Sequence, residues 1–319
     1  MSEEERAPPV EAERVLVIKH GAIGDFVLAT GAMAAISDAH ADAEITLLTT
    51  RPMLGLAETC PYFDALWLDD KPGWTRPFAW WSLLRQIARS RFTRIYDLQG
   101  SARTAAYFRF ARRLGLRAEW VGAARGCSHP LPAAGRAPEL HPLERVALLL
   151  AAAGIDEPPP PALPWLEADV VRFALAGRYV LLVPGGAPHR PEKRWPVDQY
   201  AALARSLTRR RAIPVVIGTA AEKALARDLV AGCQGARDLT GETTLAEVHA
   251  LALGAAGAVG NDTGPMHLIA VAGAPAVVLF GGASDPRRSA PRAPNVAVLR
   301  RDPLSGLSVG EVEAALRLR

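Results

Sequence analysis

The sequence has 319 residues, of which 50% are hydrophobic, 22% charged and 6% aromatic, a composition typical of a globular protein and not of a disordered or fibrous one. Its length fits two domains better than one, each large enough to bury a core without disulfides or metals. The net charge of +4 is too small for the basic surface of a nucleic-acid-binding protein, so we expect no nucleic-acid partner.

Basic residues and cysteines are used unevenly. Only four of the 37 basic residues are lysines, namely Lys19, Lys71, Lys193 and Lys223. The three cysteines are odd in number and far apart, which indicates neither a disulfide framework nor a zinc site. The first nine residues, MSEEERAPP, are acidic and polar, unlike an export signal. We therefore expect a cytoplasmic protein.

Two segments raise the question of a membrane. The longest uncharged stretch, 268–284, is interrupted by glycines and a proline and is too short to span a bilayer. Residues 78–87 (FAWWSLLRQI) combine paired tryptophans with an arginine, as in helices that lie on a membrane surface. The more ordinary interpretation of 78–87 is a helix packed on its own domain, and a peripheral membrane contact stays open.

The first half of the chain alternates short β-branched runs with segments of helical spacing. Strands are predicted at 15–19, 45–48, 65–68, 94–98 and 118–121. Helices are predicted at 25–37, 54–59, 80–88, 101–114 and 143–153. This alternation predicts a parallel sheet with helices on both faces.

The second half repeats the alternation after a proline-rich segment. Residues 155–165 contain five prolines, which favour extended backbone over helix or central strand. Strands are predicted at 179–183, 213–217, 258–260 and 276–280. Helices are predicted at 197–208, 222–230, 245–253 and 264–272.

We therefore predict an α/β protein of two Rossmann-like domains facing each other across a cleft. Their predicted bounds are 1–154, a linker at 155–166, and 167–319, with the last helix free to pack back on the first domain. In such sheets ligands bind at the carboxyl ends of the strands, so the loops that follow the strands should carry the chemistry.

The two loops of interest in the first half are 20–25 (HGAIGD) and 97–103 (DLQGSAR). Gly21 and Gly24 permit close backbone approach to a ligand, while the simpler interpretation is a tight turn with Asp25 as helix N-cap and His20 packed or solvated. For the second loop, recognition of an acceptor by Gln99 and Arg103 competes with simple capping of the next helix.

The two loops of the second half have features of a phosphate site. Residues 184–196 (PGGAPHRPEKRWP) bring fixed positive charge through Lys193, although most lysines are solvated and Trp195 suits packing. Residues 259–267 (VGNDTGPMH) place a helix N-terminus after a strand, which suits a diphosphate, while Thr263 as an ordinary N-cap is the simpler explanation.

The chain resembles glycosyltransferase family 9, the ADP-heptose:lipopolysaccharide heptosyltransferases, over about residues 14–290. The resemblance lies in six segments, which are VLVIKHGAIGD, YDLQGSAR, PGGAPHRPEKRWP, GTAAE, DLTGETTLAE and VGNDTGPMHLIAVAGAPAVVLFG. It implies a GT-B glycosyltransferase that inverts the anomeric centre, needs no metal or cofactor, and takes an ADP-sugar as co-substrate. The first domain would bind a lipid-linked saccharide acceptor, and the second the nucleotide sugar.

The resemblance also implies roles for individual residues. Asp25 matches the catalytic base, with Gly21, Gly24, Gln99 and Arg103 on the acceptor side. The residues implied for the donor and its phosphates are Lys193, Thr263, Gly264, His267, Asp262 and Glu222. Glu222 would contact the ribose, and Asp262 the hydroxyls of the donor sugar.

Three alternatives stay open. A nicotinamide-dependent oxidoreductase would suit paired α/β domains, but the GxGxxG motif is missing after the first strand. Another nucleotide sugar or acceptor is compatible with the same motifs, since segments 188–192 and 123–139 depart from the family pattern. A nucleotide-sugar-binding protein without catalysis is the third.

Overall fold

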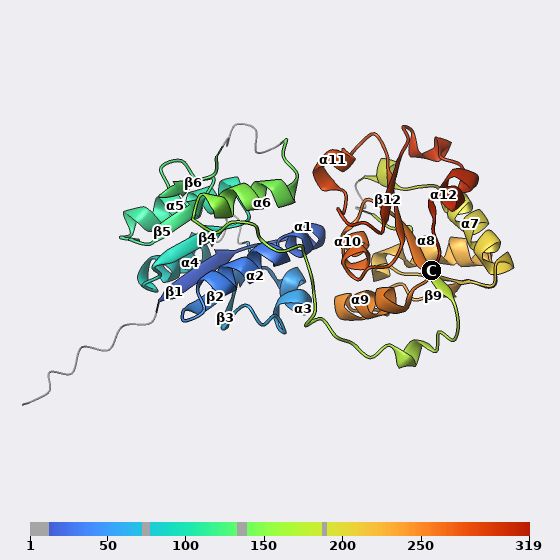
Figure 1. The fold of residues 1–319 in the computed structure, drawn as a ribbon, viewed down its shortest axis with the longest axis horizontal. Helices are drawn as coiled ribbons and strands as arrows, with labels where there is room; N and C mark the ends of the chain where they lie inside the picture. The colour runs from blue at the N-terminus through green and yellow to red at the C-terminus, as the bar shows by residue number, and fades with distance from the viewer. Residues whose placement is uncertain (1–12, 72–76, 133–138, 187–189) are drawn as a thin grey trace, which may run out of the picture.

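The computed structural model describes residues 13–71, 77–132, 139–186 and 190–319. These residues form two α/β halves, each built on a six-stranded parallel sheet (Figure 1). The acidic N-terminal segment 1–9, residues 133–138 of the 123–139 segment and residues 187–189 lie outside the described residues. No helix in the described part of the chain is long and apolar enough to cross a membrane.

The first sheet has the strand order β3-β2-β1-β4-β5-β6, the Rossmann order. Its strands are β1 (Arg14–Ile18), β2 (Glu44–Thr49), β3 (Ala65–Leu68), β4 (Arg94–Asp97), β5 (Glu119–Gly122) and β6 (His129–Pro130). The central strand β1 is buried on both sides, which explains its continuous β-branched and aliphatic sequence. The five predicted strands are present, and the two-residue β6 was not predicted.

Six α-helices accompany the first sheet. They are α1 (Ile23–Leu28), α2 (Thr30–Ala39), α3 (Leu54–Ala57), α4 (Pro77–Arg89), α5 (Ala102–Arg113) and α6 (Pro142–Ala151). The single helix expected at 25–37 is wrong, because the helix is interrupted at Ala29. There the Thr30 hydroxyl donates a hydrogen bond to the Val27 carbonyl and competes with the regular helical pattern.

The second sheet repeats the topology in the order β12-β11-β10-β7-β8-β9. Its strands are β7 (Tyr179–Val183), β8 (Ile213–Val216), β9 (Arg237–Asp238), β10 (Gly257–Asn261), β11 (Ala276–Phe280) and β12 (Val296–Arg300). The α-helices are α7 (Val197–Arg209), α8 (Lys223–Ala231), α9 (Leu245–Gly254), α10 (Gly264–Val271), α11 (Pro286–Ser289) and α12 (Val309–Ala315). The elements β9, β12 and α11 were not predicted from the sequence, and the last helix, α12, was expected without bounds.

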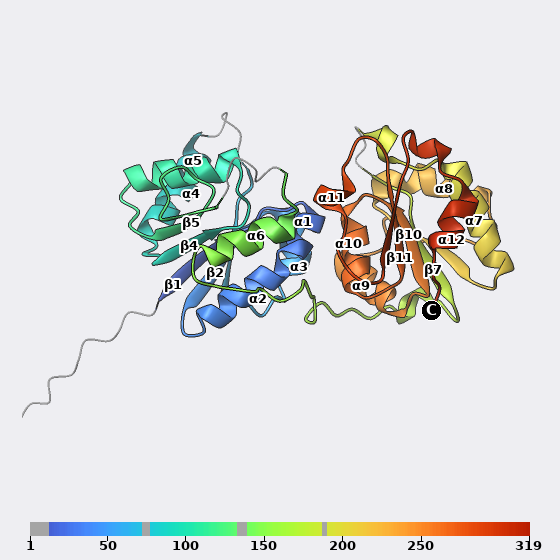
Figure 2. The ribbon, with the colours of Figure 1, turned by 45° about the horizontal axis from the view of Figure 1, so that its top comes forward.

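The two halves are in contact through α1 and α10. Both views place α1, at the edge of the first half, opposite α10 of the second (Figures 1 and 2). One apolar cluster continues across this contact, with Phe26 on one side and Leu268 on the other. Two polar contacts add to it: His141 bonds the Ala290 carbonyl at 3.0 Å, and Arg292 bonds Glu144 at 2.6 Å.

The proline-rich segment is attached to the first half. Its Pro159 carbonyl lies so close to Gly31 that a Cβ added there would be 1.9 Å away. The Ala162 N–H donates to the Thr30 hydroxyl, and the Trp165 indole N–H donates to the Leu56 carbonyl. The last helix, α12, packs against α7 within the second half.

Candidate functional site

The starts of α1 and α10 meet at the contact between the halves. A Cβ at Gly24 would lie 2.6 Å from the His267 ring, and a Cβ at Gly264 would lie 2.8 Å from the Ile23 side chain. Each helix follows a central strand of its sheet, β1 or β10, next to the point where the strand order reverses. Ligands of open α/β sheets bind at this point, and here the two sheets present it to each other.

Asp25 lines a cavity beside this contact. It is in the first turn of α1, whose N-cap is Ala22, so the interpretation of Asp25 as the N-cap is wrong. The cavity measures about 480 Å³ and receives side chains from both halves, among them Arg145 of α6 and Arg288 of α11. No hydrogen bond or ion pair holds either guanidinium among the described residues.

Two buried ionisable groups, Lys19 and Asp97, lie near Asp25, and Asp97 lines the cavity. Lys19, directly after β1, donates a hydrogen bond to the Leu98 carbonyl at 3.3 Å, and burial lowers its pKa to about 8 while the charge of Asp25 acts in the opposite direction. Burial raises the pKa of Asp97 to about 6, although its carboxylate accepts hydrogen bonds from the Gln99 and Gly100 N–H groups. The sequence analysis assigned no role to Lys19.

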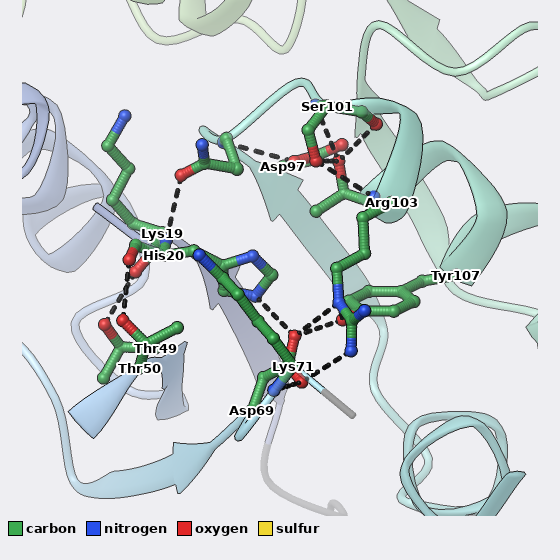
Figure 3. A network of polar contacts seen from close by, with 12 residues as sticks. Lys19, His20, Thr49, Thr50, Asp69, Lys71, Asp97, Ser101, Arg103 and Tyr107 are labelled. Atoms are coloured by element: carbon green, nitrogen blue, oxygen red, sulfur yellow. Dashed lines mark hydrogen bonds and ion pairs between the residues drawn. The ribbon is translucent and has the colours of Figure 1, made fainter. Parts of the chain in front are cut away.

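Arg103 belongs to a polar network with His20, Asp69 and Tyr107 at the ends of β1, β3 and β4 (Figure 3). The Gln99 side chain accepts a hydrogen bond from the His20 N–H at 2.9 Å. Arg103 binds both oxygens of Asp69, at 2.8 and 2.9 Å, and Tyr107 also donates to Asp69. Although burial acts in the opposite direction, these bonds lower the pKa of Asp69.

His20 packs inside this network as a neutral ring. Its Nε2 is 3.5 Å from Asp69, and burial lowers its pKa to about 4. The expectation of a packed histidine is thus confirmed. Gly21, next to it, has a φ of +106°, a conformation that favours glycine.

Lys193 is held by Asp262 at the start of α10. The Nζ–Oδ2 distance is 2.9 Å, and both side chains are largely shielded from solvent. The structure therefore brings together two of the predicted donor residues from loops far apart in sequence. The solvated lysine of the simpler interpretation is not observed.

Asn261 and Trp195 hold these loops in place. The buried Asn261 amide donates to the Pro184 and Gly185 carbonyls and accepts from the Trp195 N–H and the Tyr200 hydroxyl. The Trp195 indole is buried against Tyr200 and donates to the Leu307 carbonyl. Trp195 is thus a packing residue, as the sequence indicated.

Glu222 joins the loops after β7 and β8. One carboxylate oxygen accepts from the Gly186 N–H at 2.9 Å, and the other from the Thr219 N–H at 2.7 Å. A Cβ at Gly185 would lie 1.7 Å from this carboxylate, so the close approach requires glycine. Arg194 bonds the Gly186 carbonyl and ties the same loop to the Lys193 segment.

The start of α10 is not capped by a side chain. Thr263 is the N-cap residue, but its hydroxyl donates to the Asn261 carbonyl instead. His267 is buried in the same helix, and burial lowers its pKa to about 4, with Asp262 and Asp25 acting in the opposite direction. Its Nδ1 has no hydrogen-bond partner among the described residues. His267 is therefore a neutral donor or acceptor at pH 7, not a cation.

Four of the predicted residues lie at the contact and cavity between the halves, namely Gly24, Asp25, Gly264 and His267. Three more lie at the start of α10, namely Lys193, Asp262 and Thr263. Gly21 and Gln99 adjoin His20 in the polar network of the first half. Glu222 adjoins the start of α10 through the Gly186 loop, whereas the Arg103 guanidinium is directed to Asp69. Arg145 and Arg288 were missed, since neither lies in a motif and α11 itself was not predicted.

The cysteines and other metal-binding side chains do not form clusters. Cys60, Cys127 and Cys233 are free and buried. Within the described ranges, no three side chains of His, Cys, Asp or Glu are grouped as ligands of one metal ion would be.

Comparison with known proteins identifies the family. Residues 80–308 match the family described as glycosyltransferase family 9 (heptosyltransferase). The chain belongs to glycosyltransferase family 9. Among curated members, lipopolysaccharide heptosyltransferase 2 of Salmonella typhimurium is 34% identical over 104 residues, which are 31% of this chain and 30% of that protein. The sequence match thus spans about a third of the relative's length.

Solved structures of family 9 share the fold over almost the whole chain. The family 9 glycosyltransferase of Veillonella parvula superposes with a TM-score of 0.80 at 20% identity, covering 95% of both chains. The E. coli heptosyltransferase WaaC with ADP-2-deoxy-2-fluoro heptose superposes with a TM-score of 0.73 at 20% identity, covering 94% of this chain and 98% of that one. The fold is thus the two-domain GT-B architecture predicted from the sequence.

Proposed function

We propose that this protein is an inverting glycosyltransferase that moves a heptose-like sugar from ADP-heptose to a lipopolysaccharide core acceptor at the cytoplasmic face of the inner membrane. The family and the substrates named for its relatives support the donor and acceptor classes. The observation that carries the proposal is the position of Asp25, in a cavity between the halves and beside the start of α10.

In this reaction Asp25 acts as general base. Its carboxylate takes the proton of an acceptor hydroxyl while that oxygen attacks the anomeric carbon of the donor. The new glycosidic bond forms as the bond from the anomeric carbon to the diphosphate oxygen breaks, so the configuration inverts and ADP leaves. The acceptor would enter from the side of Gly21 and Gly24, with Gln99 and Arg103 shaping that wall.

The leaving diphosphate must be stabilised as its negative charge develops. Lys193 supplies a cation once its ion pair with Asp262 opens, and Asp262 is then available to the sugar hydroxyls. Thr263 and Gly264 present the uncapped N-terminus of α10, and the neutral His267 ring can donate a hydrogen bond. Glu222 keeps lone pairs for the ribose hydroxyls, and no step requires a metal or a cofactor.

The test is transfer of radiolabelled heptose by Asp25→Ala and Asp25→Asn. We expect both to abolish transfer while the affinity for ADP, measured by calorimetry, stays within about twofold. Activity should persist in excess EDTA. Strong residual turnover in the Asp25 variants would show that Asp25 is not the general base. A requirement for a metal ion would contradict the role of Lys193 as the cation that stabilises the leaving diphosphate.

A binding panel tests the donor class separately. ADP-heptose, ADP-glucose and UDP-glucose are titrated side by side, and we expect the ADP sugars to bind more tightly than UDP-glucose. Preference for UDP-glucose would point to another nucleotide sugar. Binding without transfer to any acceptor fraction would favour a nucleotide-sugar-binding protein.

A further inference from the structure

An exposed apolar surface covers the outer side of α4 and α5. Phe78 is 86% exposed and Trp81 is 49% exposed on α4, while Phe110 and Leu114, at the end of α5, are 37% and 41% exposed. The two helices are in contact, and Figure 2 shows them side by side in the first half. We call these four residues and the arginines of the two helices the α4–α5 face.

The charge of this face has one sign. The helices α4 and α5 carry six arginines, which are Arg85, Arg89, Arg103, Arg109, Arg112 and Arg113, and neither helix contains an acidic residue. Arg103 is used inside the protein by Asp69. Those of α5 beyond it, Arg109, Arg112 and Arg113, are exposed.

Arginines and aromatic rings are interleaved on the face. The Arg85 guanidinium lies 4.8 Å from the centre of the Trp81 ring, and Arg113 lies 5.5 Å from the centre of Phe110. Trp80 connects the two helices, since its ring packs edge-on against Phe110 at 5.5 Å. Aromatic tips beside cations are the combination that suits the boundary between lipid headgroups and acyl chains.

We infer that the α4–α5 face docks on the surface of an anionic bilayer. A second copy of the chain is a poor occupant, because pairing the face with itself would bring two sets of arginines together. An anionic membrane supplies both the negative charge for the arginines and the apolar layer for Phe78 and Trp81. The α4–α5 face would lie on the surface of the bilayer, and no segment of it would cross the bilayer.

The location of the face fits the cavity. The helix α5 follows the loop whose Asp97 and Gly100 line the Asp25 cavity, and it ends at Arg113 in the face. Its 12 residues span about 18 Å at 1.5 Å per residue. The saccharide of a lipid-linked acceptor can thus reach the cavity while its lipid stays in the bilayer. This geometry rests on the proposed function, but binding of the face to lipid does not.

Vesicle sedimentation of the full chain tests the inference without donor or acceptor, so its outcome is independent of the transfer assay. We expect binding to vesicles containing about one third phosphatidylglycerol, little binding to pure phosphatidylcholine, and weaker binding as salt increases. Arg109→Gln with Arg113→Gln should lower the partition coefficient roughly tenfold or more. Phe78→Ser with Trp81→Ser should also lower it.

The matched control is Val171→Ser with Leu253→Ser, two exposed apolar residues of the second half, 81% and 56% exposed. These variants should bind vesicles as the unmodified chain does, and all variants should keep its melting temperature. Equal binding to neutral and anionic vesicles, or an equal loss in the control, would overturn the inference. Two other results would also overturn it. One is a dimer in sedimentation velocity that the variants of the α4–α5 face abolish. The other is binding to random RNA that is tighter than binding to vesicles and that the same variants abolish.

Discussion

Lys193 illustrates what a single residue can do in two states of the site. In the structure its ammonium group is neutralised by Asp262, at 2.9 Å. Under the proposed function, a diphosphate bound at the adjacent uncapped start of α10 would offer more negative charge than Asp262, and the lysine would exchange one anionic partner for another. This exchange would place the charge of Lys193 where the leaving group develops its own.

We predict that Lys193→Ala weakens the binding of ADP by about 1–3 kcal/mol, the range for a lost hydrogen bond to a charged group. Isothermal titration calorimetry measures the effect. Lys223→Ala is the matched control, because Lys223 lies in the same half and pairs with Asp238 and Glu242. An unchanged affinity in Lys193→Ala would contradict the proposed phosphate contact.

For single residues, the sequence predicted which loops form the site better than it predicted the contacts that each residue of these loops makes. The motif around Asn261 and Asp262 indicated a site, yet only the structure shows that Asn261 is fully used in holding the neighbouring loops. Likewise, Gln99 accepts a hydrogen bond from the His20 N–H, and Arg103 binds the carboxylate of Asp69. Such pairings join residues from different strands, which no local pattern reveals.

Among the elements, α1 and α10 matter most, because their first turns form the contact between the halves. Glycine at positions 24 and 264 lets the two helices approach until the His267 ring lies against the backbone of Gly24 and the Ile23 side chain lies against the backbone of Gly264. A helix start with any larger residue at Gly24 would displace the His267 ring. The packing of these two helices therefore fixes the position of Asp25 relative to Lys193 and Thr263.

We predict that Gly24→Ala lowers the free energy of unfolding by about 1–3 kcal/mol, the usual cost of overpacking. Urea denaturation measures this change. The double variant Gly24→Ala with His267→Ala should be less destabilised than the sum of the two single variants, because the clash disappears with the ring.

Gly55→Ala is the control for this prediction. A Cβ at Gly55 would meet no atom within 4 Å, and the residue lies in the helix α3. We expect this variant to be as stable as the unmodified protein or slightly more stable. Equal destabilisation by Gly24→Ala and Gly55→Ala would show that the close approach to His267 is not the cause.

The strands and helices of the regular alternation, from β1 to β5 in the first half and from β7 to β11 in the second, were predicted from the sequence, apart from the two-residue β9. The strands β6 and β9 have two residues each, too few to show any alternation. The strand β12 is a partly exposed edge strand. Only the four-residue helix α11 separates it from β11, so the alternation of strand and long helix stops before it. The break between α1 and α2 depends on the Thr30 hydroxyl, which helical spacing does not encode.

For the whole molecule, buried neutral histidines in both halves link stability to pH. Burial lowers the pKa values of His20 and His267 to about 4, compared with 6.5 for an unfolded chain. Between these values the unfolded state binds more protons than the folded state. Their contribution to stability is therefore present above pH 6.5 and is lost as the pH falls toward 4.

We predict that the free energy of unfolding of His20→Gln depends less on pH between 4 and 6.5 than that of the unmodified protein. The difference in slope should approach one proton, about 1.4 kcal/mol per pH unit. Urea titrations at several pH values measure it. Parallel slopes for the two proteins would contradict a neutral, buried His20.

The division into two similar halves was evident from the sequence, but their mutual arrangement was not. The residues in contact, such as Gly24 and His267, are far apart in the chain, and each has an ordinary local role. The proline-rich segment was expected to be a stiff spacer between the domains. In the structure it is a bound part of the first half, anchored at Thr30, Gly31 and Leu56.

This attachment locates where the chain passes from one half to the other. Trp165 is bonded to Leu56 of the first half, and the carbonyl of the next residue, Leu166, is bonded to His249 of the second. The passage from one half to the other thus lies near Trp165 and Leu166, and Leu163 and Pro164 already line a pocket with His249 of α9. No helix or strand of the described chain lies between Ala151 and Val171, so an exchange of coding sequence there between family members would swap whole halves. Under the proposed function, such an exchange would let the choice of acceptor and the choice of donor be inherited separately.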